Sequence, residues 1–398
     1  MSSSVSSVAR VGFVGAGQLA RMAIEAAIPL GIPVVLLAER TDDGAALVSP
    51  SVLIGRPDDP AAMTRLAEAT DVITFDHELV DVGILEDLES EGHLVRPGSA
   101  VMGLVQDKLA QRRTLSRLGL PVPEYAPVED ASDIQAFGEH HGWPVIVKAV
   151  RGGYDGRGVW VVDWPDGANR LVAELGPDAR LLVERRVAIV REVAVQVARR
   201  PSGEIAVYPL IETVQLDGIC RELRYPAPVS AAVADEAVAL GRRIAEAIGL
   251  VGLLAVELFV ACGADGTEHL IVNELAARPH NSAHWTIEGS VTSQFAQHLR
   301  AVLDLPLGST AAVSPAVSSV NILGAVGSSG DPRLRLPAAL ADPDVRVHLY
   351  GKTARPGRKI GHVTLTGDDL DDLSARAHRA AAILGGETIE RAGERDDA

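Results

Sequence analysis

Short apolar runs alternate with amphipathic segments through the first quarter of the chain. The runs "VARVGFVG", "PVVLLAE" and "DVITFD" predict strands, and helical patterns begin near Gln18 and in "DDPAAMTRLAEAT". Strands that alternate with amphipathic helices predict a parallel sheet with right-handed crossovers. A helical run follows from Ser99 to Leu118, where Gly119 and two prolines end it. We therefore predict a doubly wound α/β domain over residues 8–120.

The pattern changes after residue 120. Strand-like runs lie close together in "VIVKAV", "GVWVV", "RLLVE", "REVAVQVA" and "IAVYPL", and "REVAVQVA" partly alternates with the period of an antiparallel strand. The amphipathic helix "ADEAVALGRRIAEAIGL" leads into two further strands, "VGLLAVELFV" and "HLIVNEL". We predict an α+β domain with an antiparallel sheet over residues 121–315, a small C-terminal cap domain over 316–388, and flexible tails at 1–7 and 389–398.

Composition excludes several classes of partner. The chain has 398 residues, which suggests more than one domain, and a formal net charge of −16. Such a surface repels nucleic acid and acidic membranes, so we expect neither as a partner, and an anionic ligand would need local cationic clusters. Only Cys220 and Cys262 are present, which argues against disulfides or a thiolate metal site. Without an apolar run of transmembrane length or a signal-like start, we expect a cytoplasmic protein.

The first glycine turn is a candidate phosphate site. In "GFVGAGQLA", Gly15, Gly17 and Ala20 follow the G-x-G-x-x-G/A arrangement between a strand and a helix, and Glu39 ends the next strand. Amides at a helix N-terminus can hold a phosphate, and Glu39 could bind a ribose. A turn that serves only close strand–helix packing is the alternative.

A second glycine-rich loop is more specific. In "VIVKAVRGGYDGRGVW", Lys148 ends a strand, and four glycines follow between residues 152 and 158. A lysine ammonium can bind phosphate oxygens as a point charge, and glycines let backbone amides approach them and let a loop move. We predict a mobile flap over residues 151–158, with a plain surface turn as the alternative.

Two glutamates flank a predicted hairpin. If the turn at "GADG" is centred midway between Glu257 and Glu274, their side chains face each other on one side of the strand pair. Opposed carboxylates repel at about 5 Å between Cβ atoms, and Mg²⁺ bound by carboxylates and substrate phosphates would relieve the repulsion. In the alternative, the register slips and one glutamate points into solvent.

Two further segments gather polar and basic residues. The segment "LAARPHNSAHW" holds Arg278, His280, Asn281, Ser282 and His284, without the further ligands that a zinc site needs. The segment "YGKTARPGRKIGH" holds Lys352, Arg355, Arg358 and Lys359. Anion or substrate binding fits both segments, while a solvated basic turn remains the alternative for the second.

Taken together, these motifs resemble the ATP-grasp superfamily and, within it, the N5-carboxyaminoimidazole ribonucleotide synthase family. The resemblance runs from about Val11 to His362 and is most specific in "GAGQLARM", "GGYDGRG", "NELAARPHNSAHWT" and "RPGRKIGH", in matching order and spacing. It implies a ligase that carboxylates aminoimidazole ribonucleotide with ATP and bicarbonate through carboxyphosphate, releasing ADP and phosphate, in purine biosynthesis. ATP, Mg²⁺ (with Mn²⁺ as an alternative ion) and a homodimer are also implied.

The resemblance also assigns roles to individual residues. It implies catalytic roles for Tyr154, Asp155, Arg157, Arg278 and Lys352, and metal binding by Glu257 and Glu274. The implied ATP site comprises Lys108, Lys148, Gly153, Tyr154, Asp155, Gly156, Arg157, Gly158, Val159, Glu184, Arg185, Arg186, Val187, Glu192, Gln215, Asn273 and Glu274. The implied ribonucleotide site comprises Gln18, Leu19, Asp76, Glu78, His280, Asn281, Ser282, Lys352, Arg355 and Arg358.

The sequence also departs from the family pattern. The family often has a second glycine at Ala16, arginine at Lys108, lysine at Arg112 and histidine at Gln215. Lys108 keeps the charge but loses the planar fork of arginine. Competing interpretations are another ATP-grasp ligase, such as a formate-dependent glycinamide ribonucleotide transformylase, an NAD-dependent oxidoreductase that uses Gly15 and Glu39, and a non-catalytic nucleotide-binding subunit.

Overall fold

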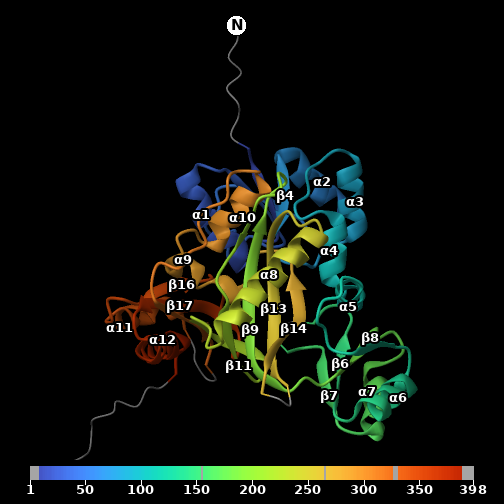
Figure 1. The fold of residues 1–398 in the computed structure, drawn as a ribbon. Helices are drawn as coiled ribbons and strands as arrows, with labels where there is room; N and C mark the ends of the chain where they lie inside the picture. Colours follow the sequence, from blue (N-terminus) through green and yellow to red (C-terminus); the bar gives the residue numbers. More distant parts are fainter. Residues whose placement is uncertain (1–8, 154–155, 264–265, 326–329, 388–398) are drawn as a thin grey trace, which may run out of the picture.

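The computed structural model describes residues 9–153, 156–263, 266–325 and 330–387. The predictions made for Tyr154, for Asp155 and for the tails at 1–7 and 389–398 lie outside these residues. Figure 1 shows three regions: an upper α/β layer, a long central sheet, and a smaller lobe at the lower right. These regions meet around one pocket.

The N-terminal region is the predicted parallel α/β unit. Its sheet has the order β3-β2-β1-β4, and every neighbouring pair is parallel. All residues of β1, β2 and β4 are buried, as in a sheet covered by helices on both faces. The strands are β1 (Val11–Val14), β2 (Val34–Ala38), β3 (Val52–Ile54) and β4 (Val72–Phe75), and the helices are α1 (Gln18–Ala27), η1 (Ile28–Leu30), α2 (Pro60–Ala69) and α3 (Val82–Ser90).

The single helical run expected from Ser99 to Leu118 is in fact two helices. They are α4 (Ser99–Gln106) and α5 (Lys108–Arg117), and Asp107 between them has extended backbone angles, φ −120° and ψ 103°. The Asp107 carboxylate accepts a hydrogen bond from the amide of Ala110, which caps α5. The new helix start redirects the chain toward the lower-right lobe (Figure 1).

That lobe is a four-stranded antiparallel sheet with two helices on it. The order is β5-β8-β6-β7, and Ile134 and Phe137 of α6 share a core with Val145 and Val147 of β6. The strands are β5 (Tyr125–Val128), β6 (Val145–Ala149), β7 (Val159–Val162) and β8 (Leu181–Arg185), and the helices are α6 (Ala131–His141) and α7 (Pro165–Leu175).

The largest sheet runs across the predicted boundary at residues 315 and 316. Its order is β14-β13-β9-β11-β12-β15-β17-β16, and β10 pairs with β9. These strands are β9 (Ile189–Arg199), β10 (Ile205–Val207), β11 (Ile211–Leu216), β12 (Ile219–Tyr225), β13 (Gly252–Cys262), β14 (Glu268–Ala276), β15 (Ala316–Leu323), β16 (Arg346–Leu349) and β17 (Lys359–Gly367). The accompanying helices are α8 (Ala231–Ala247), η2 (Asn281–Ala283), α9 (Thr286–Gly289), α10 (Gln294–Val302), η3 (Pro332–Arg335), α11 (Leu336–Ala339) and α12 (Leu370–Gly385).

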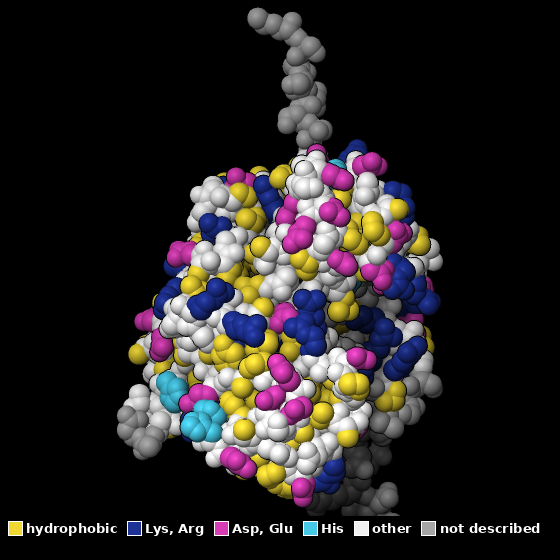
Figure 2. All heavy atoms as spheres, turned by 90° about the vertical axis from the view of Figure 1, so that its right-hand side faces the viewer, with side chains coloured by type: hydrophobic (Ala, Val, Ile, Leu, Met, Phe, Trp, Pro, Cys, Tyr) yellow, Lys and Arg dark blue, Asp and Glu magenta, His cyan; other side chains and the backbone are white. Residues whose placement is uncertain are grey.

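Shared cores join these regions. One cluster contains Phe13 and Leu19 of the first layer together with Phe295 and Leu299 of α10 and Tyr350 after β16. Basic side chains (dark blue) gather in a band across the middle of the face in Figure 2, although the chain is acidic overall. Within the described residues, no helix is both long and apolar enough to span a membrane.

Candidate functional site

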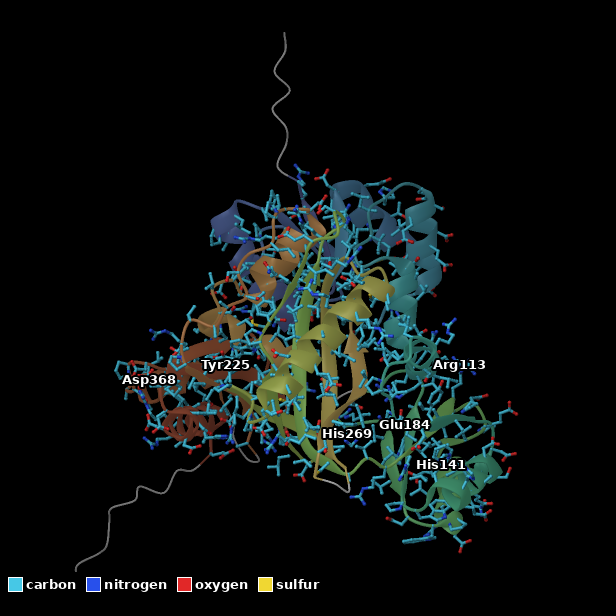
Figure 3. All side chains as sticks on the ribbon, in the orientation of Figure 1. Arg113, His141, Glu184, Tyr225, His269 and Asp368 are labelled. Carbon is cyan, nitrogen blue, oxygen red and sulfur yellow. The ribbon has the colours of Figure 1, made fainter. Side chains whose placement is uncertain are left out.

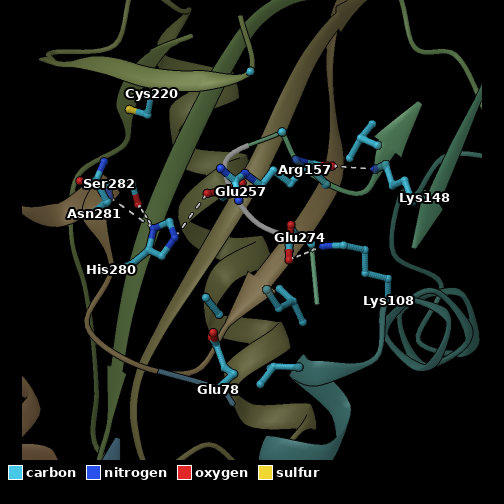
Figure 4. Close-up of a pocket in the computed structure, with 18 of the residues that line it drawn as sticks. Glu78, Lys108, Lys148, Arg157, Cys220, Glu257, Glu274, His280, Asn281 and Ser282 are labelled. Atoms are coloured by element: carbon cyan, nitrogen blue, oxygen red, sulfur yellow. Dashed lines mark hydrogen bonds and ion pairs between the residues drawn. The ribbon is translucent and has the colours of Figure 1, made fainter. Parts of the chain in front are cut away.

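A large pocket opens where the three regions meet. Its volume is about 2160 Å³, and its lining comes from the first layer, the small lobe, the large sheet and the loop before β17. Glu184, on β8 of the small lobe, lies at the edge of that lobe next to the large sheet (Figure 3), and Figure 4 shows Lys108, Glu257, Glu274 and His280 in the same pocket. The pocket therefore collects side chains from segments far apart in the sequence.

Glu257 and Glu274 face each other, as expected for a hairpin whose turn lies midway between them. Leu258 pairs with Val272, whereas Glu257 pairs with Glu274, so Asn273 is an extra residue in β14. Without this bulge, Glu257 would face Asn273 and the Glu274 side chain would point to the opposite face of the sheet. The bulge thus places both carboxylates in one pocket.

The two glutamates have different partners. Burial, together with Glu274 and Glu192, raises the pKa of Glu257 to about 7. Glu274 forms an ion pair with Lys108, and His280 Nε2 lies 3.6 Å from Glu257 Oε1. No group of three or more His, Cys, Asp or Glu side chains in the described ranges has the arrangement of a metal site. A cation held here would thus need oxygen atoms from a ligand besides the glutamates.

The two carboxylates fit a hard divalent cation. Paired oxygen donors that repel each other are neutralised by Mg²⁺, which favours carboxylate and phosphate oxygens. Burial and the charges of Glu274 and Glu192 raise the pKa of Glu257, so a nearby positive charge would favour its ionised form.

Lys148 belongs to a buried ionic network. Its Nζ lies 2.8 Å from Glu184 Oε2 and 3.2 Å from Asn273 Oδ1, while Arg112 Nε lies 2.6 Å from Glu184 Oε1. Burial alone would raise the pKa of Glu184, but Lys148 and Arg112 hold it below its usual value. Glu184, which sequence reasoning proposed as a nucleotide contact, lines the pocket, and its carboxylate also pairs with two cations and positions Lys148.

The glycine-rich flap borders the pocket. Arg151, Gly152, Gly153, Gly156, Arg157 and Val159 line it. Gly156 and Gly158 have φ values of +75° and +74°, which favour glycine. Gly153 differs, because its φ is not positive; a Cβ there would instead lie 2.8 Å from the backbone oxygen of Arg157.

The first glycine turn does not offer a free anion site. Asp76 Oδ2 accepts from the Gly17 amide at 2.6 Å, and Asp76 Oδ1 accepts from the Ala20 amide at 2.7 Å. The carboxylate thus occupies the position that a dinucleotide phosphate would take, which argues against the oxidoreductase interpretation. Asp76, proposed as a substrate contact, caps α1 instead of lining the pocket, whereas Gln18 and Leu19 do line it.

Charged residues gather at the other end of the pocket. Arg278 Nε lies 2.8 Å from Glu78 Oε2, and Lys352 Nζ contacts Gln18 Oε1. The predicted residues that line this end are Gln18, Leu19, Glu78, Arg278, His280, Asn281, Ser282 and Lys352. Arg355 and Arg358 do not belong to the lining, and Arg358 Nη1 donates to the Thr353 carbonyl oxygen at 3.2 Å.

Apart from Gly158, which is not in the lining, the remaining predicted nucleotide residues that the structure describes also border the pocket. Burial raises the pKa of Glu192, and Arg185 forms an ion pair with Glu124 at 3.1 Å. The lining at this end includes Lys108, Lys148, Glu184, Arg185, Arg186, Val187, Glu192, Gln215, Asn273 and Glu274.

Lys359 and Arg112 are among the side chains here that were not predicted as site residues. Lys359 lines the pocket, and only its place in the basic segment after Tyr350 could have indicated it. Arg112 was noted as a departure, but nothing in a helical pattern reveals that an arginine will be 1% exposed beside a buried glutamate.

Models of three domain families match this chain. The ribonucleotide synthetase preATP-grasp domain matches residues 8–106, the ATP-grasp domain 113–295, and the phosphoribosylaminoimidazole carboxylase C-terminal domain 318–376. The N5-carboxyaminoimidazole ribonucleotide synthase of Mycobacterium tuberculosis is 48% identical over 382 residues, covering 94% of this chain and 87% of that protein. The synthase of Corynebacterium ammoniagenes is 44% identical over 377 residues, covering 94% and 91%.

Solved structures agree with these matches. The synthase of Aspergillus clavatus in complex with ADP and 5-aminoimidazole ribonucleotide has a TM-score of 0.85 and 32% identity, covering 95% of this chain and 98% of that one. The synthetase of Thermus thermophilus has a TM-score of 0.84 and 34% identity, covering 96% and 99%. The three-part ATP-grasp fold predicted from sequence is confirmed. This chain belongs to the N5-carboxyaminoimidazole ribonucleotide synthase family of ATP-grasp proteins.

Proposed function

We propose that this protein carboxylates the exocyclic amine of 5-aminoimidazole ribonucleotide, using ATP and bicarbonate and releasing ADP and phosphate. One observation carries the proposal: a relative that covers almost the whole chain was solved with ADP and this ribonucleotide. The pocket agrees with two substrates, because cationic residues gather at both of its ends, Lys148 at one and Lys352 at the other.

Lys148 serves the phosphate end of ATP. Glu184 holds its ammonium from one side, so the positive charge is positioned before the nucleotide arrives. A preorganised cation stabilises charge that develops on a transferred phosphoryl group without reorganisation during the reaction. Lys108 contributes a second cation, which forms an ion pair with Glu274.

Bicarbonate becomes a competent electrophile when its oxygen attacks the terminal phosphorus of ATP. The products of that step are carboxyphosphate and ADP, and the amine then attacks the carboxyl carbon and expels phosphate. Arg157 and Arg278 are our choices to hold these anions, and both line the pocket. The flap excludes water from the reactive mixed anhydride.

Tyr154 and Asp155 of the flap complete this site in our proposal. Asp155 orients the amine or accepts its proton, if it comes within hydrogen-bond reach.

Glu257 and Glu274 would hold Mg²⁺, which supplies Lewis-acid stabilisation of the phosphoryl oxygens when bound. This predicts that Glu274→Gln reduces the rise in melting temperature that Mg·ATP gives to the parent protein, because ligand binding stabilises the native state in proportion to affinity. Thermal melting with and without Mg·ATP measures this directly. An equal rise in both proteins would contradict the metal assignment.

The reaction is tested by measuring ADP release while each substrate is omitted in turn. We expect ADP release to require both the aminoimidazole ribonucleotide and bicarbonate. Release that requires formate and glycinamide ribonucleotide would instead favour the transformylase alternative. If no ADP is released with either combination of substrates, both functional assignments are contradicted.

We also propose, from the family resemblance, that the protein acts as a homodimer in the cytoplasm. The mass in solution, measured by light scattering at several concentrations, tests the dimer. Localisation of the full chain with a fluorescent tag in its own cells tests the compartment.

A further inference from the structure

A chain of hydrogen bonds runs from the core of the large sheet to His280. Gln196, in the middle of β9, is 1% exposed, and its Nε2 donates to Ser282 Oγ at 2.8 Å. Ser282 Oγ lies 2.8 Å from His280 Nδ1, and the Ser282 amide also donates to this nitrogen at 3.3 Å. Figure 4 shows His280 between Ser282 and Glu257.

The donors in this chain have a fixed direction. An amide NH₂ group can only donate, so Ser282 Oγ accepts from Gln196, which leaves its proton available for His280. The Ser282 backbone amide, which also can only donate, points at His280 Nδ1, so this nitrogen accepts, and in a neutral imidazole the proton then belongs to Nε2. That nitrogen lies 3.6 Å from Glu257 Oε1, so the ring presents an N–H group to the carboxylate.

The opposite tautomer would place a lone pair of Nε2 beside the Glu257 oxygen. The two lone pairs would repel when Glu257 is ionised, and the pocket would lose a donor next to the glutamate that we assign to the metal. Gln196 Oε1 has no hydrogen-bond partner in the part of the chain that the structure describes. The hydrogen bond to Ser282 is therefore the side-chain contact through which this buried amide can act.

We propose that Gln196 is a positioning residue for the carboxylation reaction, which acts through Ser282 to fix His280 as the tautomer with its proton on Nε2. The inference rests on the proposed function. It gives Gln196, which does not border the pocket, the role of orienting the His280 donor beside Glu257. Partners that orient the residues around a metal site typically contribute about tenfold to 100-fold in activity or metal affinity.

The tautomer can be read directly from the nitrogen resonances of histidine. In the full chain labelled with ¹⁵N-histidine, the signals of His280 are those lost in His280→Asn. We expect the parent to show the Nε2–H tautomer alone. Gln196→Glu should populate the Nδ1–H tautomer, because a carboxylate at 196 would take the Ser282 proton, and Gln196→Met should give a mixture.

Turnover is measured on the same proteins. We expect kcat to fall about tenfold or more in Gln196→Glu and less in Gln196→Met. Gln297→Met is the matched control, since Gln297 is equally buried but bonds the backbone of Gly308, away from the pocket. It should leave the tautomer and kcat of the parent intact.

The outcomes separate the two proposals. If Gln196→Glu fails to fold, Gln196→Met still decides. An unchanged tautomer, an unchanged kcat despite a changed tautomer, or an equal loss in Gln297→Met would each overturn the role of Gln196. A parent that shows the expected tautomer but releases no ADP with the proposed substrates would overturn the proposed function instead.

Discussion

Glu257 lies beside two other carboxylates, Glu192 and Glu274, on the face of the large sheet that borders the pocket. Although 32% of its side-chain surface is exposed to the pocket, desolvation by the surrounding protein and the two neighbouring carboxylates raise its pKa to about 7. The free glutamate side chain titrates near 4.3. Folding therefore works against the charged form of Glu257.

This conflict predicts a pH-dependent effect of Glu257→Gln. Because the pKa is higher in the folded state, the native protein binds more protons, and the parent loses stability as pH rises from about 4.5 to 7. Glutamine cannot ionise, so the melting temperature of the variant relative to the parent should rise across this window. Melting without nucleotide or divalent cations, from pH 5 to pH 8, measures it. Glu246→Gln, exposed on α8, is the control and should show no such trend.

Lys352 gives a prediction about the second substrate. It lines the pocket and contacts Gln18, whereas Arg358 lies outside the lining. Lys352→Ala should raise the KM for aminoimidazole ribonucleotide more than tenfold, equivalent to about 1.4 kcal/mol, as loss of a charge-assisted contact allows. Arg358→Ala should have the smaller effect in the same steady-state assay. A change confined to the KM for ATP would show that this end binds something else.

Sequence patterns could predict the pairing of Glu257 with Glu274 because their midpoint falls at the turn. They could not predict the bulge at Asn273 that produces this pairing. They also could not reveal Gln196, because a buried glutamine in an alternating strand looks like an ordinary interior position. Its role depends on Ser282, 86 residues away in sequence.

Among the elements, the flap is held at its base and contacts the large sheet at its tip. The Lys108 amide donates to the Val150 carbonyl oxygen at 2.9 Å, and Arg151 Nε lies 3.4 Å from Asp107 Oδ2. At the tip, a Cβ on Gly156 would lie 3.3 Å from Gly218, in the turn between β11 and β12. The flap thus links the small lobe to the large sheet.

Alanine at two flap positions tests this arrangement. Gly156→Ala would strain a backbone at φ +75°, and Gly153→Ala would bring Cβ to 2.8 Å from the Arg157 oxygen. Turnover should fall in both by tenfold or more, while melting changes little, because the loop adds little to the core. Gly203, at φ +95° in open space between β9 and β10, is the control: Gly203→Ala should lower the melting temperature and leave turnover unchanged. Full activity in both flap variants would show that these glycines serve only chain reversal.

Apolar periodicity predicted the strands and the N-terminal helices, because each of these elements buries one or both of its faces. Periodicity did not reveal the break between α4 and α5, because an aspartate can lie within a helix or cap a new one, and tertiary contacts reinforce the cap here. Asp107 is also approached by Arg180 at 3.4 Å, from the loop before β8. No local pattern contains that contact.

At the scale of the whole molecule, the large sheet joins the central and C-terminal regions. The junction contains Glu222 of β12, which is 1% exposed and accepts from Ser318 of β15 at 2.8 Å. Arg224 and His378 lie 2.9 and 3.1 Å from its other oxygen. Burial alone would raise the pKa of Glu222, but the hydrogen bonds from these side chains lower it to about 2.

Glu222→Gln should therefore weaken the junction in a pH-dependent way. The folded pKa lies below the unfolded value near 4.3, so the stabilisation is present above that pH and is lost as pH falls toward 2. We expect a deficit of about 2 kcal/mol at neutral pH, because the half-exposed His378 and partly exposed Arg224 can regain water. Urea unfolding at pH 7 and pH 3.5 measures this, and a deficit that widens in acid would contradict it.

The pairing of β12 with β15 has one more consequence. β15 covers the backbone of β12 from Glu222 to Tyr225, and nothing else in the described chain pairs with that side of the strand. A chain ending at residue 315 would therefore bare an open sheet edge, which is a template for joining identical molecules strand to strand. We expect such a truncated protein to aggregate, visible as light scattering that grows with concentration. If the truncated protein stayed monomeric, the C-terminal domain would not be needed to protect this edge. Aggregation would mean that the domain also prevents association between copies of the chain.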